Sequence, residues 1–226
     1  MSHKLFLVPT PIGNLKDITF RAVEVLKEVD TILAEDTRIT GKLLKHYDIS
    51  TKLEAYHQHN EHSKTGNIIK RLLEGELIAL VSDAGTPSVS DPGFFIVREC
   101  IKHDIKVECL PGATALIPAL VISGLPSEKF IFEGFLPPKK GRNKRLEELK
   151  GIDKTIILYE SPHRLIKTLS QLSEIFSTDL YVVVCRELTK MYEEVVRGNV
   201  ADVTEHFKIS PVKGEIVIVF NAGTSL

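Results

Sequence analysis

The sequence predicts an α/β protein in which a mainly parallel sheet, covered by helices on both faces, precedes a mixed-sheet α+β domain. Over the first half of the 226-residue chain, short apolar runs alternate with segments of helical apolar spacing. After Ser127 the rhythm changes, and predicted strands outnumber helices. Gly, Pro and Ser interrupt the pattern between these parts. We therefore expect an N-terminal domain over residues 1–124 and a C-terminal domain over residues 125–226.

The N-terminal half repeats one strand-and-helix unit. Lys4–Val8 is a short apolar run stopped by Pro9, and Thr19–Val29 then has helical spacing behind a capping Thr19. Predicted strands follow at 31–34, 77–81 and 106–110, and predicted helices at 37–47, 61–73, 94–102 and 114–123. Such repetition predicts a parallel sheet that is buried on both faces.

The C-terminal half is dominated by strands. They are expected at 129–133, 155–159, 180–186, 191–196 and 215–220, with only two or three helices between them. Glu187–Lys190 is short enough to join two antiparallel strands. This pattern therefore predicts a mixed sheet.

Composition excludes several classes of protein. Hydrophobic residues make up 43% of the chain and charged residues 26%, as in ordinary globular domains. The formal net charge is -1, so any site for a polyanion has to be local. The three cysteines form no CxxC pair, and no apolar run approaches the length of a membrane span. We expect a cytoplasmic protein.

Four polar, Gly- and Pro-rich loops follow predicted parallel strands, at the sheet edge where ligands bind in such folds. They cover 8–14, 33–38, 81–93 and 110–115. None contains the GxGxxG, GxxxxGK[ST] or GxSxG pattern, and the chain has no HExxH helix. In the third loop, VSDAGTPSVSDPG, Gly85 permits close backbone approach and Pro87 fixes φ, which favours contacts made by main-chain groups. A tight connector without function is the alternative for that loop alone.

The LAEDTR loop supplies two carboxylates at the same edge. Asp36, or its neighbour Glu35, is a candidate general base, and Arg38 is a candidate phosphate contact. In the alternative interpretation, Asp36 caps the following helix and pairs with Arg38. The two roles are compatible.

Two further polar segments invite a function. His57, His59 and His62 lie close together, but no cysteine or carboxylate pattern accompanies them, so we expect no metal site. The basic arm, Leu136–Arg145, holds five basic residues and no acid; it either grips phosphates or is a solvated loop. Its basic residues are Lys139, Lys140, Arg142, Lys144 and Arg145, and the later SPHR segment adds Arg164.

Seven motifs carry a family resemblance. From about Leu5 to Phe220 the chain contains, in order, VPTPIGNLKDIT, AEDTR, YHQHNE, SDAGTPSVSDPG, PGATA, FEGFLPPKKG and YESPHR. This set closely resembles the bacterial ribosomal RNA ribose 2′-O-methyltransferases of the tetrapyrrole methylase superfamily. Members of that superfamily hold S-adenosylmethionine between two α/β domains and form homodimers, and these members methylate a cytidine ribose in the decoding region of 16S rRNA. The resemblance implies the same fold, cofactor, substrate and homodimer here.

The resemblance also implies site residues. Gly85, Thr86 and Pro87 fall on the Gly-Asp-Pro element of the superfamily, with Thr86 where relatives have Asp. The other implied cofactor positions are Ile12, Val89, Thr114, Ala115 and, more loosely matched in the second domain, Tyr159, Leu188 and Gly214. His57, His59 and Asn60 are implied to face the substrate, a solvated polar loop being the alternative. Relatives often continue past the last strand, and the sequence leaves open whether that extension is absent or trimmed.

Two rival functions remain open at this point. The same fold methylates tetrapyrrole precursors, for which the basic arm would be unnecessary. A ribosome assembly factor that binds the cofactor without turnover is a rival from another functional class.

Overall fold

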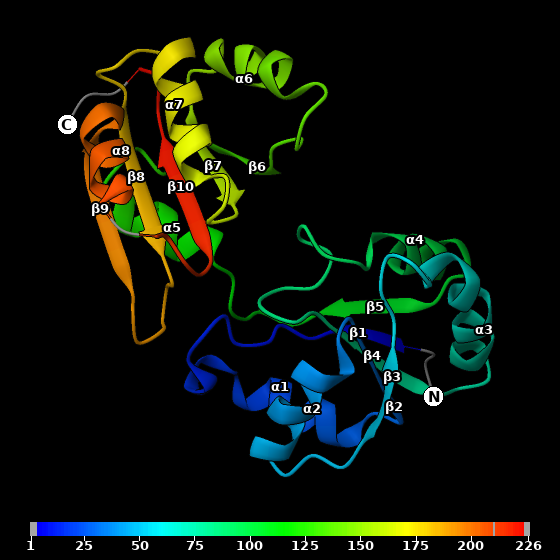
Figure 1. The fold of residues 1–226 in the computed structure, drawn as a ribbon. Coiled ribbons are helices and arrows are strands. Elements are labelled where there is room, and N and C mark those ends of the chain that lie inside the picture. The colour runs from blue at the N-terminus through cyan, green and yellow to red at the C-terminus, as the bar shows by residue number, and fades with distance from the viewer. Residues whose placement is uncertain (1–3, 210, 224–226) are drawn as a thin grey trace. The chain divides into compact units, whose positions relative to one another are not determined.

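The chain folds into two compact units that divide between Thr114 and Ala115 (Figure 1). The computed structural model describes residues 4–209 and 211–223. The sequence analysis put the boundary at residue 124. The helix α5 (Leu116–Ser123) lies between these two positions, and it packs on a strand of the second unit.

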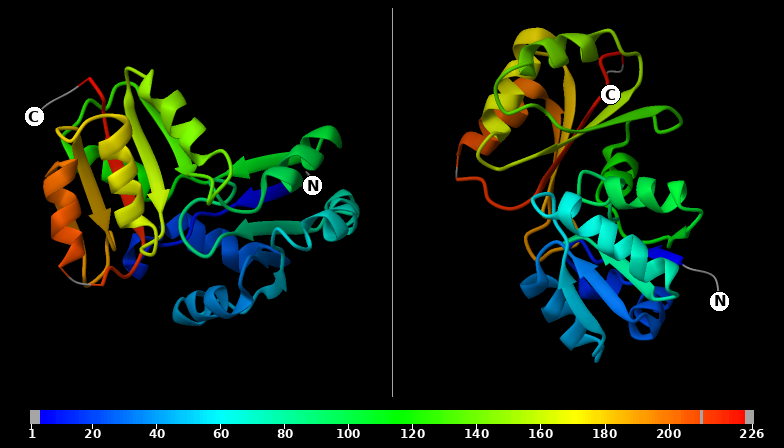
Figure 2. Two further views of the ribbon diagram at one scale, coloured as in Figure 1. Left: turned by 45° about the horizontal axis from the view of Figure 1, so that its top comes forward. Right: turned by 90° about the vertical axis from the view of Figure 1, so that its right-hand side faces the viewer.

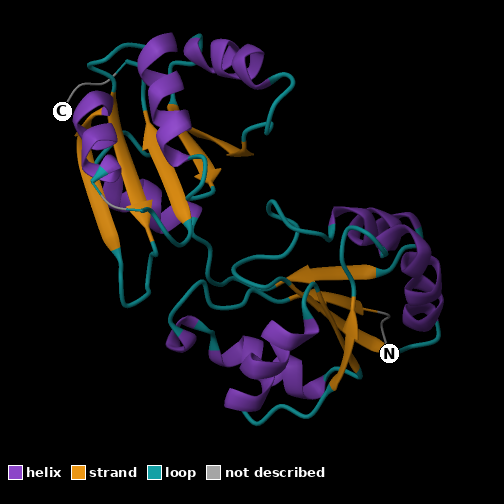
Figure 3. Ribbon diagram, in the orientation of Figure 1, coloured by secondary structure: helices purple, strands orange, loops and turns teal. Residues whose placement is uncertain are grey.

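The first unit is a parallel sheet with helices on both faces (Figure 3). Its strand order is β3-β2-β4-β1-β5, and every neighbouring pair is parallel. The strands are β1 (Lys4–Leu7), β2 (Thr31–Ala34), β3 (Lys52–Ala55), β4 (Leu77–Val81) and β5 (Lys106–Cys109). The helices are the short 3-10 turn η1 (Leu15–Asp17), α1 (Phe20–Glu28), α2 (Thr37–His46), α3 (Glu61–Leu73) and α4 (Phe94–Lys102).

Alternate side chains of this sheet enter two separate cores. Leu5, Leu33 and Leu80 pack with apolar residues of α3 and α4. Ile32 and Ala79 point the other way and pack with α1 and α2. Because both faces of the sheet are covered, β2 is buried at each of its four positions, without the alternation of a half-exposed strand.

The second unit is a mixed sheet, as predicted. Its strand order is β6-β7-β10-β8-β9; β6 runs parallel to β7 and the other neighbours are antiparallel. The strands are β6 (Phe130–Phe135), β7 (Thr155–Glu160), β8 (Tyr181–Arg186), β9 (Glu194–Asn199) and β10 (Ile216–Phe220). The helices α6 (Arg142–Lys150), α7 (Leu165–Ile175) and α8 (Val200–Lys208) cover one face, visible in both views of Figure 2. Helix α5 contacts β10.

Three elements differ from the sequence prediction. Strand β3 went unpredicted because its sequence, KLEA, is half polar and lies at the sheet edge. The last strand of the β8–β9 hairpin begins at Glu194 rather than Met191, because hydrogen-bonded turns occupy 187–193. The C-terminal part of the basic arm is not loop, since Arg142–Arg145 form the first turn of α6.

Among the described residues, no helix combines the length and apolarity that a membrane crossing requires.

Candidate functional site

The four polar loops of the first unit are hydrogen-bonded to one another. The Asp36 backbone N–H donates to Asp83 Oδ1 at 3.0 Å, which joins the loop after β2 to the loop after β4. Thr10 and Gly85 exchange backbone hydrogen bonds of 2.9 Å each, which joins the loop after β1 to the loop after β4. The Thr86 hydroxyl donates to the Ala113 carbonyl at 3.0 Å, which joins the β4 loop to the loop after β5. The loops at this edge therefore form one connected backbone surface rather than separate connectors.

Gly85 is the residue on which this surface depends. Its φ is +82°, a left-handed conformation that side-chain-bearing residues rarely adopt. A Cβ at this position would contact Ile12 Cγ2 at 3.4 Å and the Ala113 carbonyl at 3.7 Å. The structure thus brings together Ile12, Gly85, Thr86 and Ala113 from three loops, and Thr114 adjoins them.

The same loop continues through Pro87 to Val89 with further special backbone. Ser88 has a φ of +70°, and its hydroxyl is buried without a hydrogen-bond partner among the described residues. The Val89 N–H donates to the Thr86 carbonyl at 3.4 Å, so the segment closes into a turn. A buried hydroxyl without a hydrogen-bond partner and a strained backbone are features of ligand-binding loops.

Asp36 caps helix α2, as the alternative interpretation expected. Its Oδ1 accepts the Arg38 backbone N–H at 2.8 Å, and its two oxygens accept Nε and Nη2 of Arg38 at 2.6 to 3.2 Å. These hydrogen bonds from Arg38 lower the pKa of Asp36 to about 2. Asp36 is therefore ionised at neutral pH but is a weak proton acceptor.

Glu35 lies in a different environment. It is half-buried and forms no hydrogen bond or ion pair with another of the residues described here. Burial, and then the charges of Asp83 and Asp36, raise the pKa of Glu35. Asp83 is close enough to Asp36 to accept its backbone N–H at 3.0 Å, and burial raises the pKa of Asp83 as well. A carboxylate with a raised pKa and free oxygens is suited to accept a proton.

The loop after β3 holds His57, His59 and Asn60. The Asn60 side chain accepts the His57 backbone N–H at 2.9 Å, and its amide lies 3.0 Å from His57 Nε2. The other ring nitrogen of His57, Nδ1, is buried without a partner in the described chain. His59 is exposed, with its ring 5.9 Å from that of His57. Within residues 4–209 and 211–223, no group of three His, Cys, Asp or Glu side chains could hold a metal ion.

In the second unit, the three implied cofactor positions lie at one edge of the sheet. Tyr159 is next to the end of β7, Leu188 follows β8, and Gly214 precedes the antiparallel β10. The Tyr159 ring packs against Phe132 at 4.8 Å between centroids. A Cβ on Gly214 would overlap the Glu187 side chain, which accepts the Glu215 backbone N–H at 2.9 Å.

The basic arm lies at this same edge, because it follows β6, which runs parallel to β7. Lys139, Lys140 and Lys144 are exposed and form no ion pair with another described residue. Arg145 is paired with Glu133 at 2.6 Å and with Glu148 at 2.9 Å. Arg142 corrects the sequence prediction: it is 2% exposed and pairs with Glu160, so it is not available to a phosphate.

The chain matches one family model over most of its length. Residues 4–204 match the model of the tetrapyrrole (corrin/porphyrin) methylases. The chain belongs to the tetrapyrrole methylase family. It is also 51% identical over 216 residues to a ribosomal RNA small subunit methyltransferase I of Halalkalibacterium halodurans, covering 95% of this chain and 74% of that protein. A protein of the same name from Synechocystis is 49% identical over 221 residues, covering 97% and 79%.

Solved structures share the tetrapyrrole methylase fold at lower identity. A diphthine synthase matches with a TM-score of 0.78 and 17% identity, covering 99% of this chain and 91% of that one. A cobalt precorrin-4 methyltransferase of cobalamin biosynthesis matches with a TM-score of 0.73 and 19% identity, covering 97% and 95%. A uroporphyrin-III C-methyltransferase from Thermus thermophilus, solved with S-adenosylhomocysteine, matches with a TM-score of 0.67 and 18% identity, covering 97% and 98%.

This tetrapyrrole methylase is an S-adenosylmethionine-dependent methyltransferase. Its first unit fits the cofactor, because the loop around Gly85 offers main-chain groups, a buried unpartnered Ser88 hydroxyl and space that a side chain on Gly85 would occupy.

Proposed function

We propose that this methyltransferase transfers a methyl group to the 2′-oxygen of a cytidine ribose in the decoding region of 16S rRNA. The observation that carries the proposal is the 51% identity over 216 residues to a ribosomal RNA small subunit methyltransferase I. The exposed, unpaired lysines of the basic arm support it, because they offer the local positive charge that an RNA backbone requires in a chain of net charge -1.

The cofactor-binding residues of the first unit are Ile12, Gly85, Thr86, Pro87, Val89 and Thr114, with Ala115 next in the chain. Tyr159, Leu188 and Gly214 are the proposed contacts from the second unit. When bound, S-adenosylmethionine supplies an electrophilic methyl group on a sulfonium. The chain itself contributes main-chain positioning, which accounts for much of the rate in such in-line transfers.

Glu35 is the proton acceptor in this proposal. The carboxylate of Glu35 would accept the proton of the ribose hydroxyl. The new oxygen–methyl bond would replace the sulfur–methyl bond of the cofactor, which would leave as a neutral thioether. Glu35 fits the role better than Asp36, whose oxygens are engaged by Arg38 and whose pKa is lowered to about 2. Asp36 then acts by capping α2 and by holding Arg38.

The proposed RNA contacts are the exposed lysines of the arm together with polar residues at the two sheet edges. They comprise Lys139, Lys140, Lys144, Arg38, His57, His59, Asn60 and Arg164. Arg145 contributes only if it leaves Glu133 and Glu148. With an rRNA substrate, the enzyme would act in the cytoplasm.

We also propose a homodimer. The proposal rests on the resemblance to a superfamily whose members form homodimers. Light scattering at micromolar concentration should give twice the mass of one chain, and a monomer mass would contradict the proposal.

One experiment tests the function. Transfer of labelled methyl groups is measured onto unmodified small ribosomal subunits, free rRNA and a porphyrin precursor. Label in the ribose of a 16S cytidine is expected from the first acceptor. Label in the porphyrin alone would favour tetrapyrrole methylation, and cofactor binding without transfer to any acceptor would favour an assembly factor.

A further inference from the structure

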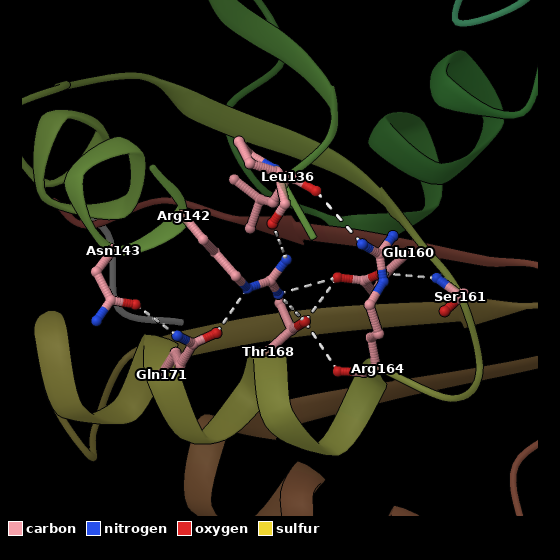
Figure 4. A network of polar contacts seen from close by, with 9 residues as sticks. Leu136, Arg142, Asn143, Glu160, Ser161, Arg164, Thr168 and Gln171 are labelled. Atoms are coloured by element: carbon pink, nitrogen blue, oxygen red, sulfur yellow. Dashed lines mark hydrogen bonds and ion pairs between the residues drawn. The ribbon is translucent and has the colours of Figure 1, made fainter. Parts of the chain in front are cut away.

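A buried polar cluster lies directly behind the basic arm. We call it the Glu160 network, and Figure 4 shows its members: Arg142, Glu160, Arg164, Thr168 and Gln171. Arg142 is 2% exposed and Glu160 3%. Two charges taken out of water cost several kcal/mol each, and apolar residues of similar volume are often as stable in their place. The pair therefore calls for an explanation other than stability alone.

Arg142 uses each nitrogen of its guanidinium. Nε donates to Gln171 at 2.7 Å, Nη1 donates to the Pro137 carbonyl at 3.3 Å, and Nη2 donates to Thr168 at 2.5 Å and Glu160 at 3.1 Å. The planar fork of arginine allows these contacts at the same time, which the single ammonium of lysine does not.

Arg164 contacts the arm in a similar way. Its Nε pairs with Glu160 Oε1 at 2.8 Å, and its Nη1 lies 3.5 Å from the Leu136 carbonyl. Glu160 thus holds two arginines, and each of them reaches a carbonyl at the start of the arm, at Leu136 and Pro137.

Lys139 and Lys140 lie between two points of the chain that the network holds. Pro137 is bonded through its carbonyl, and Arg142 is itself buried, so only residues 138–141 span the distance between them. Lys139 and Lys140 are in this span, and the Arg142 N–H closes a turn on the Lys139 carbonyl at 3.4 Å. Pro138, whose ring fixes φ, further restricts the backbone of this span. The network consequently limits the directions in which both lysines project.

We propose that Arg142, held by Glu160, is a positioning residue that orients Lys139 and Lys140 toward RNA phosphates and does not contact RNA itself. The inference rests on the proposed RNA substrate. It deepens that proposal by separating the residues of the arm that bind from the one that arranges them. A preorganised arm loses less conformational entropy on binding, which raises affinity.

The test is Arg142→Lys, which keeps the charge but removes the fork. Binding to unmodified small subunits should weaken about fivefold, and the salt dependence of binding should flatten as the lysine contacts are lost. Affinity for S-adenosylmethionine should not change, and it reports that the protein is folded. If Arg142 contacted phosphate directly, R142K would retain affinity and salt slope, and that result would overturn the proposal.

Arg71→Lys is the matched control. Arg71 is also ion-paired through several guanidinium nitrogens, but its partners are Glu54, Glu76 and Thr31 in the first unit, with no bond to the arm carbonyls. R71K should bind RNA within about twofold of the parent. Should R142K fail to fold, Gln171→Leu removes the acceptor of Arg142 Nε from a partly exposed position, and a loss of about twofold is expected. Unchanged binding by a folded Q171L would then count against the proposal.

A double-mutant cycle completes the test. In the K139A/K140A background, R142K should weaken RNA binding no further, because Arg142 acts through those lysines. Additive losses would overturn the positioning role while leaving RNA binding by the arm intact. If K139A/K140A alone binds RNA like the parent, the phosphate contacts of the arm are refuted and this inference with them. Methyl transfer to small subunits, measured on the parent, reports separately on the proposed function.

Discussion

The carboxylate of Asp36 accepts both the backbone N–H and the guanidinium of Arg38, two residues further along the chain. Asp36 therefore caps helix α2 and neutralises Arg38 with the same two oxygens. Glu35, its neighbour, is half-buried and is left without such a partner in the described chain. Adjacent acids of the same loop thus have pKa values displaced in opposite directions, which separates their chemistry.

We expect Glu35→Gln to lower kcat for methyl transfer about a hundredfold or more, since the amide cannot accept the ribose proton. Cofactor affinity should be retained. Asp36→Asn is the matched control, because Asn also caps helices; its kcat should stay within about threefold of the parent. Radiolabel transfer under single-turnover conditions measures both. Equal losses in the two variants would contradict the assignment to Glu35.

The pH dependence of the reaction gives a second test. Because burial and nearby acids raise the pKa of Glu35, the acidic limb of the kcat/KM profile should lie above the range of an ordinary carboxyl. Asp83→Asn removes one of those charges, lowers the pKa of Glu35 and should move the limb to lower pH. An unmoved limb in D83N would show that another group titrates.

The stability of the fold should also depend on pH, through the lowered pKa of Asp36. Its folded-state pKa, about 2, is below the ordinary value, so the contribution of the ion pair with Arg38 is present above the ordinary pKa. It is lost as pH falls through the folded-state pKa. Acid unfolding of D36N should therefore be less steep near pH 2 than that of the parent, as followed by circular dichroism. Identical acid transitions would argue against the pair.

Gly85→Val should weaken S-adenosylmethionine binding about tenfold or more, because a β-branched residue is strained at a φ of +82° and would fill space beside Ile12. Gly75→Val is the control. Gly75 has a φ of +100°, but a Cβ there meets no atom within 4 Å. Calorimetry should show that G75V loses stability and keeps cofactor affinity. Parent-like affinity in a folded G85V protein would remove the loop from the cofactor site.

Replacing Lys139, Lys140 and Lys144 by Ala should flatten the salt dependence of RNA binding, by nearly one unit of slope for each lost phosphate contact. Filter binding to unmodified small subunits measures the slope. A charge-matched control replaces Lys129, Lys150 and Lys154, which are exposed elsewhere in the second unit. If the salt dependence of RNA binding has the same slope in both triple variants, the lysines of the arm are ordinary surface charges.

The first unit was largely predictable from local pattern. Helices α3 and α4 and strands β2 and β4 have the predicted bounds, because apolar spacing and Gly or Pro breaks are local properties of the chain. Strand β3 was missed, since its half-polar sequence is stabilised by pairing with β2 rather than by burial of its own. The resemblance carried by seven motifs predicted the family that the comparisons confirm.

What the sequence determined by itself was therefore the order of the elements other than β3, the loops at the sheet edges and the family. The tertiary structure decided which charged side chains are buried and paired and which are exposed. Arg142 and Lys140 look alike in the KKGR segment, yet Arg142 is buried against Glu160, eighteen positions away, while Lys140 is exposed. Glu35 and Asp36 likewise differ, because burial and the charge of Asp83, which is distant in sequence, raise the pKa of Glu35, whereas Arg38 lowers the pKa of Asp36. Charge availability depends on partners that only folding brings together, because desolvation and ion pairing act over a few ångströms of space whatever the separation along the chain.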